Sequence, residues 1–182
     1  PRFDLDAGLY LSEASSVGLR PRDRTPLGGI ESGIQATFYS INAGTWSAFA
    51  SALTLGEGRR DIAFYSVDYQ GNREAERTAT IFVDASTPTA GLSANQGMIA
   101  RPEGFLVLAP TVTLTISAED PLIAQARSGL SLVEFAVDGA TLAPSFSPGA
   151  ASVSTGTFLL AGLHSIRVFA QDRTGHAVER SW

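Results

Sequence analysis

The sequence contains no cysteine and no lysine, and it has only two histidines and one methionine among its 182 residues. Without cysteine, neither a disulfide framework nor a thiolate metal site can form. No apolar run approaches the roughly 20 residues that a membrane-spanning helix needs. The longest runs are FLVLAP and FLLAGL. These absences exclude a disulfide scaffold and a zinc–thiolate centre, and they predict no insertion into a membrane.

Charge is also scarce. Only 17% of the residues are charged, against roughly 25% in a typical soluble domain. The formal net charge is -5, and all 13 cationic side chains are arginines that stand singly or in pairs. Nucleic acids and anionic membranes are bound through basic surfaces that release counterions, so we expect neither as a partner.

The chain is nevertheless apolar enough to fold, since 44% of its residues are hydrophobic. Its periodicity is that of strands: TVTLTIS (111 to 117) alternates apolar with polar residues, and no window of eleven residues carries a helical stripe. We therefore expect about seven short strands in each half of the chain. In the first half the expected strands span 9–12, 15–21, 34–42, 45–49, 52–55, 60–68 and 74–84.

An internal repeat relates the two halves. SGIQATFYSIN begins at Ser32 and matches SGLSLVEFAVD, which begins 96 positions later at Ser128. LGEGRRDIAFYSVDYQGN (55 to 72) matches LLAGLHSIRVFAQDRTGH (159 to 176) at an offset of 104 positions, which leaves eight extra residues in the second copy. A fixed self-similarity of this kind is typical of repeat architectures. We predict an all-β chain of two tandem β-sandwiches, spanning residues 1–87 and 88–182, the second with a short last strand.

The best-matched feature of the repeat is a turn. Asp68 ends a predicted strand in SVDYQGN, and Asp172 does so in AQDRTGH. An aspartate in this place accepts hydrogen bonds from the backbone N–H groups of the turn, and glycine tolerates the positive φ that follows. We expect the turn to fix the register of the last two strands in each copy.

The residues of the first copy resemble a known family. SGIQATFYSINAGTWSAF, followed by LTLGEGRRDIAFYSVDYQGNREAERTATIFVDASTP, is similar to the immunoglobulin-like, fibronectin-type-III-like repeats of bacterial surface and secreted proteins. The second copy keeps SGL, EFAVDG and AGLHSIRVFAQD. The resemblance implies two tandem immunoglobulin-like or fibronectin-type-III-like sandwiches that serve as spacers, stalks or accessories to other domains, and it carries no catalytic residue across.

Candidate catalytic side chains are few. The histidines, His164 and His176, align with Arg60 and Asn72 of the first copy, and neither belongs to a nucleophile or metalloprotease motif. We expect both to be surface or turn residues and predict no enzymatic activity.

Four carboxylates are candidate calcium ligands. In a sandwich of this type Asp84, Glu119, Asp120 and Asp172 emerge near one end of the second domain, and Ca²⁺ prefers oxygen ligands drawn from several loops. No Asp-x-Asp-x-Asp-Gly loop is present. The alternative is that each aspartate caps its own turn.

Trp46 and Tyr65 are candidate sugar-binding residues, because an exposed aromatic ring can stack on a pyranose. The alternative is that Trp46 covers the edge of the sandwich and Tyr65 packs on a neighbouring strand.

The expected function is a non-catalytic spacer or stalk of an exported or surface bacterial protein, with neighbouring domains of the same polypeptide as its partners. Absence of cysteine is compatible with export. Two alternatives stay open: a carbohydrate-binding or adhesive module, with polysaccharide as its partner, and a fibre subunit in which a neighbour completes the last strand of the second domain.

Overall fold

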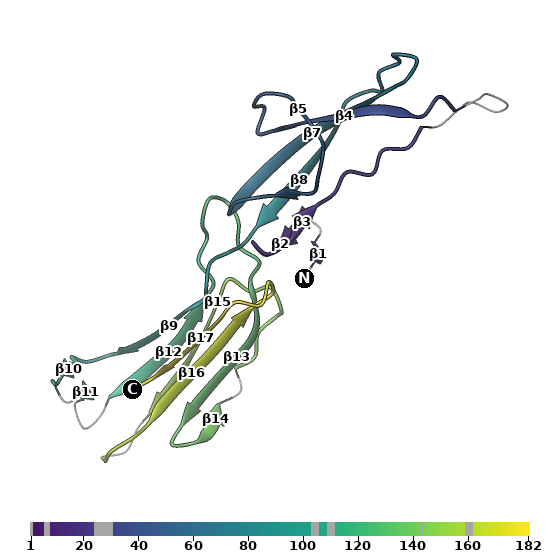
Figure 1. Cartoon of the computed structure of the whole chain (residues 1–182). Coiled ribbons are helices and arrows are strands. Elements are labelled where there is room, and N and C mark those ends of the chain that lie inside the picture. Colours follow the sequence, from purple (N-terminus) through teal and green to yellow (C-terminus); the bar gives the residue numbers. More distant parts are fainter. Residues whose placement is uncertain are drawn as a thin grey trace. The chain divides into compact units, whose positions relative to one another are not determined.

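The computed structural model describes residues 2–5, 8–23, 31–102, 106–108, 112–142, 144–158 and 162–182. These residues form strands, turns and coil, so the all-β prediction is confirmed (Figure 1). No helix in this part of the chain is long and apolar enough to cross a membrane. The strands are β1 (Arg2–Leu5), β2 (Gly8–Leu11), β3 (Ser16–Val17), β4 (Ile34–Ile41), β5 (Ser47–Ala48), β6 (Leu53–Thr54), β7 (Gly58–Asp68), β8 (Arg77–Val83), β9 (Thr89–Ala94), β10 (Ile99–Ala100), β11 (Leu106–Val107), β12 (Thr113–Glu119), β13 (Leu130–Val137), β14 (Ala140–Leu142), β15 (Ser152–Phe158), β16 (Ile166–Asp172) and β17 (Ala177–Ser181).

The contacts between Cα atoms divide the chain into two compact units. Residues 2–84 together with 124–126 form one, called the N-terminal unit below. Residues 85–123 and 127–182 form the other, called the C-terminal unit.

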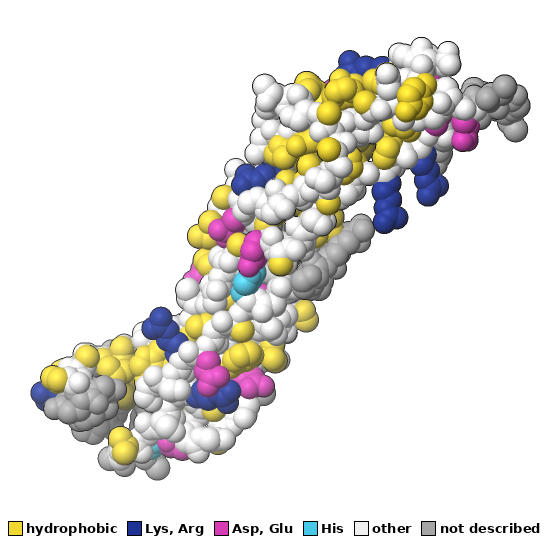
Figure 2. Space-filling model, viewed as in Figure 1, with side chains coloured by type: hydrophobic (Ala, Val, Ile, Leu, Met, Phe, Trp, Pro, Cys, Tyr) yellow, Lys and Arg dark blue, Asp and Glu magenta, His cyan; other side chains and the backbone are white. Residues whose placement is uncertain are grey.

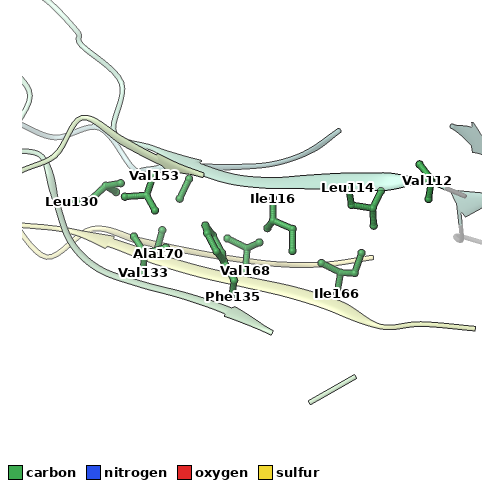
Figure 3. Packing of buried hydrophobic residues seen from close by; sticks show 11 residues of the cluster. Val112, Leu114, Ile116, Leu130, Val133, Phe135, Val153, Ile166, Val168 and Ala170 are labelled. Atoms are coloured by element: carbon green, nitrogen blue, oxygen red, sulfur yellow. The ribbon is translucent and has the colours of Figure 1, made fainter. Parts of the chain in front are cut away.

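The C-terminal unit is a sandwich of two antiparallel sheets, ordered β15-β12-β9 and β14-β13-β16-β17 (Figure 1). Alternation in β12 places Leu114 and Ile116 in the core, where each is fully buried, while the neighbouring Thr113 and Thr115 stay exposed. Phe135 and Val168 oppose them from the other sheet (Figure 3). At roughly 25 cal/mol per Å² of apolar surface, burial of such side chains is the main force that joins the two sheets.

The N-terminal unit is built around one larger sheet, ordered β1-β2-β8-β7-β4-β5, in which β2 and β8 run parallel. A two-stranded ladder, β3-β6, is its second sheet. Val17 and Leu53 of this ladder pack against a buried cluster that includes Ile62 and Ile81. This core holds fewer buried side chains among the described residues than that of the C-terminal unit.

Strand register repeats between the units. Ser16 pairs with Thr54 in one ladder, and the aligned Thr113 pairs with Phe158 in the other. Ile34 pairs with Asp68, and the aligned Leu130 pairs with Asp172. Each of these last pairs is followed by an irregularity at the same step of the ladder. A one-residue slip would turn every side chain to the other face, so the shared register means that aligned residues face the same way.

The strand predictions differ from the structure at two places. The strand expected over 15–21 is paired only at Ser16–Val17, and Pro21, within the unpaired part, has no N–H group to donate to a ladder. The β1 strand was not predicted from the sequence. At the other end, β17 has 5 residues where its counterpart β8 has 7.

Candidate functional site

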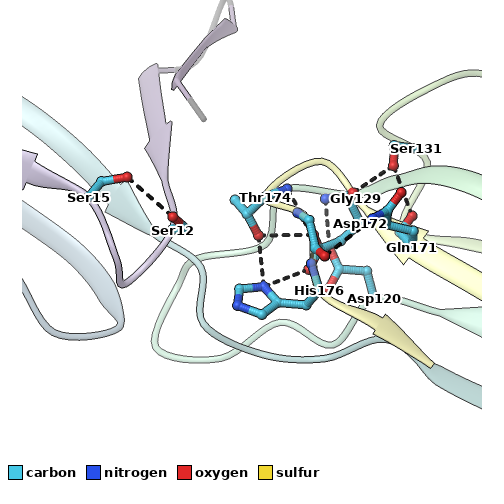
Figure 4. A network of polar contacts seen from close by, with 10 residues as sticks. Ser12, Ser15, Asp120, Gly129, Ser131, Gln171, Asp172, Thr174 and His176 are labelled. Atoms are coloured by element: carbon cyan, nitrogen blue, oxygen red, sulfur yellow. Dashed lines mark hydrogen bonds and ion pairs between the residues drawn. The ribbon is translucent and has the colours of Figure 1, made fainter.

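The turn after Asp172 is held together by the carboxylate of that residue (Figure 4). Its Oδ1 atom accepts hydrogen bonds from the N–H groups of Thr174 (2.8 Å), Gly175 (2.6 Å) and His176 (3.0 Å). The hydroxyl of Thr174 also donates to Oδ1, at 3.0 Å. Asp172 is only 1% exposed. Because all these donors converge on one buried oxygen, the side chain is the nucleus of the turn.

The turn after Asp68 has the same construction but is more exposed to solvent. Oδ1 of Asp68 accepts the N–H groups of Gln70 (2.9 Å) and Asn72 (2.8 Å), and Oδ2 accepts the side-chain amide of Asn72 (2.9 Å). These bonds, that of the Asn72 side chain first, hold the pKa of Asp68 below its ordinary value. His176 takes the place of Asn72 in the other copy, with Nδ1 3.1 Å from Oδ2 of Asp172. The predicted role of both aspartates as turn caps agrees with these contacts.

A second pair of aspartates caps the start of the β4 and β13 region. Asp120 Oδ2 accepts the N–H of Gly129 at 2.6 Å, and Asp23 Oδ2 accepts that of Gly33 at 2.8 Å. Both glycines have φ near +84°. A Cβ atom on Gly129 would collide with the backbone of Gly149, so both conformation and space require glycine there.

Three of the four predicted calcium ligands lie together. Asp84, Asp120 and Asp172 each offer a carboxylate oxygen, and these oxygens lie within 4.8 Å of one another. The three residues are 0%, 0% and 1% exposed. Glu119, the fourth, is exposed on β12 and does not belong to the cluster.

An all-oxygen cluster of this kind suits a hard divalent cation. Carboxylates so close together repel one another, and a bound cation would offset the repulsion. Ca²⁺ takes six to eight oxygen ligands, so carbonyl groups or water would complete the shell. Asp120 and Asp172 each already use one oxygen for a backbone cap. Oδ2 of Asp172 lies 3.1 Å from Nδ1 of His176, so a cation would share this oxygen with the imidazole or displace it.

The histidines occupy turns. His164 Nδ1 lies 2.7 Å from Oδ2 of Asp138, whose Oδ1 accepts the N–H of Ser165 at 2.8 Å. The His164 contact, first among the causes, holds the pKa of Asp138 below its ordinary value.

His176 makes a trio with Thr174 and Asp172 that superficially resembles a catalytic triad. Nδ1 lies 3.0 Å from the hydroxyl of Thr174 and 3.1 Å from Oδ2 of Asp172. In a working triad the nucleophile and the carboxylate contact different ring nitrogens, so that the ring can relay a proton. Here both contacts use the same nitrogen. The arrangement stabilises a turn and cannot activate the hydroxyl by that route.

The aromatic candidates belong to one cluster on the N-terminal unit. The rings of Trp46 and Tyr65 are 4.8 Å apart at an angle of 60°, and Phe38 stacks on Tyr65 at 5.3 Å. The guanidinium of Arg73 lies over the Tyr65 ring, 3.7 Å from its centre. Tyr65 is thus engaged by neighbours, whereas Trp46 is 41% exposed. Phe38 and Arg73 were not among the residues predicted from the sequence. The pairing of Phe38 with Tyr65 in the β4–β7 ladder is the signal that would have linked Phe38 to this cluster.

Charged side chains are scattered over the visible face of both units, and no large patch of one sign stands out there among the described residues (Figure 2).

Comparisons with known proteins add little. No family model matches the chain, and a search of curated proteins finds no match. Among solved structures, the chain is similar to the fibronectin(III)-like modules of CbhA from Clostridium thermocellum, with a TM-score of 0.39 and 15% identity over 96% of this chain and 86% of that one. A likeness at this score carries no weight, so the sandwich assignment rests on the strand ladders.

Proposed function

We propose that this chain is a non-catalytic structural module of a larger exported or surface protein, where it spaces or links other domains. The observation that carries the proposal is that the aspartates shared by the two copies cap turns. The carboxylates of Asp172 and Asp68 accept hydrogen bonds from backbone N–H groups of one turn in each copy. Those of Asp120 and Asp23 do the same at a second turn. Polar side chains that cap turns have a structural role, and structural repeats of this kind extend a polypeptide through nearest-neighbour contacts.

Single-molecule pulling on the chain, held at both ends between marker domains, tests this proposal. A spacer made of two independent sandwiches should unfold in two separate events. Each event should release about 30 nm of contour length, because roughly 85 residues extend by about 3.6 Å each. One event that releases the whole chain at once would contradict the proposal.

A carbohydrate-binding module is a second candidate, favoured by the surroundings of Trp46. The exposed ring borders a groove of about 380 Å³ on the N-terminal unit that is also lined by Asp61 and Glu76. An aromatic platform beside carboxylates that accept hydrogen bonds from hydroxyl groups is a suitable combination for a sugar.

Affinity electrophoresis in gels that contain soluble polysaccharides separates these candidates. A sugar-binding module should be retarded, Trp46→Ala should migrate freely, and Trp46→Phe should keep part of the retardation. A monomer that ignores every glycan favours the spacer. Polymers that grow with protein concentration in sedimentation would instead favour the fibre subunit.

Calcium is the ion proposed for Asp84, Asp120 and Asp172. The proposal rests on the burial of the three residues and the proximity of their oxygens. If the dissociation constant is one hundredth of the calcium concentration, binding adds about 2.7 kcal/mol to the stability of the folded state. Thermal unfolding in calcium and in chelator, with magnesium as the control ion, measures the effect.

A further inference from the structure

The outer face of the large sheet of the N-terminal unit carries a row of small side chains. Ser40 pairs with Ala63, and Ala63 pairs with Thr78, so the three lie side by side across β4, β7 and β8. Successive residues of a strand point to opposite faces. Because Ile62 belongs to the buried cluster, the row that contains Ala63 faces away from the core. The row lines the groove of about 380 Å³ beside Trp46.

The aligned row of the C-terminal unit holds an ion pair. The shared register makes Ala136, Arg167 and Ser181 the counterparts of the three small residues. Arg167 thus takes the place of Ala63. Its guanidinium donates to both carboxylate oxygens of Glu179, through Nε at 2.8 Å and through a terminal nitrogen at 3.5 Å. In this copy the middle of the row is therefore occupied by a guanidinium side chain.

The N-terminal unit keeps the carboxylate of this pair and lacks the arginine. Glu76 lies two residues before Thr78, just as Glu179 precedes the aligned position, and it lines the groove. No hydrogen bond or ion pair to the Glu76 side chain is present among the described residues. Because position 63 is an alanine, the place that Arg167 fills in the other copy is open.

The groove has carboxylates and no cation of its own. Asp61 and Glu76 are the charged residues among the described groove-lining side chains. Oδ1 of Asp61 accepts hydrogen bonds from Thr80 (2.7 Å) and from Arg59 (3.1 Å), so the charge of Asp61 is offset by its arginine neighbour. The charge of Glu76 has no such neighbour in the described part of the chain. A cationic ligand therefore complements the groove.

The aromatic residues of this face suit a guanidinium better than a compact ammonium group. Arg73 already places its guanidinium over the Tyr65 ring, 3.7 Å from the ring centre. Trp46 packs against Tyr65 with 4.8 Å between ring centres, yet it is 41% exposed beside the groove. A guanidinium is planar and weakly hydrated, so it can contact a ring while it donates paired hydrogen bonds to a carboxylate. Trp46 and Glu76 together offer both contacts.

We propose that this groove binds the arginine side chain of a partner polypeptide. The guanidinium takes the place that Arg167 fills in the other copy, donates hydrogen bonds to Glu76 and contacts the ring of Trp46. The small side chains of the row leave room for the aliphatic stem of the arginine. The ligand is assigned as arginine because an arginine occupies the equivalent place within this same chain. The proposal goes beyond the spacer function, which does not depend on it, and it names a different occupant for the groove from the sugar considered above.

A synthetic peptide of glycine and serine with one central arginine is the probe. The whole ¹⁵N-labelled chain is titrated with it at low ionic strength, and NMR follows the indole N–H of Trp46 and the amide of Ala63. Both signals should shift along one saturable curve with a dissociation constant on the order of 10 mM, because one exposed ion pair and one aromatic contact are weak. Peptides with lysine, or with uncharged citrulline, in place of the arginine should bind about fivefold more weakly or less.

Matched variants locate the site. Glu76→Gln should weaken binding about fivefold or more, whereas Glu179→Gln, the same change at the aligned position, should leave it unchanged. Ala63→Arg should abolish binding, because the chain then supplies the guanidinium itself, and Ala63→Ser should keep it.

Several outcomes would overturn the proposal. These are the absence of a saturable shift at about 50 mM peptide, equal binding of the arginine and citrulline peptides, and equal weakening by Glu76→Gln and Glu179→Gln. Tighter binding of a glucosamine oligomer at the same signals would assign the groove to an amino sugar and would also overturn it. Shifts that grow with protein concentration in the absence of peptide would assign the site to an arginine of a second copy, with the same consequence. The pulling experiment is unaffected by any of these results, so the spacer function is tested separately.

Discussion

Replacing Asp172 with alanine tests the claim that its carboxylate organises the turn. The change removes the acceptor of three backbone N–H groups, those of Thr174, Gly175 and His176, in a place where the side chain is 1% exposed. A hydrogen bond to a charged group is worth about 1.5–3 kcal/mol, and water will reach some of the donors once the side chain is gone. We therefore expect a loss of roughly 3–5 kcal/mol. For a unit of this size that lowers the midpoint of thermal unfolding by about 15–25 °C.

Amide exchange resolved by residue is the assay, since it reports the stability of each unit within the intact chain. Asp172→Ala should speed exchange throughout β16 and β17, and Asp172→Asn, which keeps an oxygen acceptor, should do so far less. Asp68→Ala is the matched change at the more exposed turn and should have a smaller effect on β7 and β8. Equal effects of the two alanine variants, or a loss under about 1 kcal/mol in Asp172→Ala, would refute the reasoning.

Three further predictions concern single contacts. Titration by NMR should place the pKa of Asp138 below its ordinary value of 3.8, and His164→Ala should raise it; the stability that Asp138 contributes is then complete above that ordinary value and is lost as pH falls through the lower folded-state pKa. Thr37→Val or Ser66→Ala alone should cost about 1–3 kcal/mol in chemical unfolding by leaving a buried hydroxyl unpaired, whereas the double variant should be nearly neutral; additive losses would contradict this. If calcium binds at the carboxylate cluster, Asp84→Asn should reduce the calcium-dependent rise in unfolding temperature measured against chelator.

The sequence predicts much of this fold because its strongest signals are local. Alternation in TVTLTIS is sufficient to place Leu114 and Ile116 in a core. In SVDYQGN the aspartate accepts hydrogen bonds from N–H groups of its own turn and the glycine adopts the positive φ there, so a few residues are sufficient to predict the turn.

Other features depend on pairing between distant segments. The groove of about 760 Å³ beside Leu19 and Arg20 is also lined by residues of β7 and β8, and no local pattern in the sequence predicts it. Arg73 begins the charged run REAER, yet its guanidinium lies over the Tyr65 ring. Nothing local in the sequence distinguishes a guanidinium in water from one over an aromatic ring.

The central claim is that the two halves of the chain build one strand register twice. Contacts between Hα protons across the strands test it most directly, because antiparallel ladders bring them close at pairs that exchange no hydrogen bonds. The account predicts nuclear Overhauser effects between Thr37 and Ser66 and between Ser16 and Thr54, with matching effects between Val133 and Ala170 and between Thr113 and Phe158. A register shifted by one residue in either half, or present in only one, would contradict it.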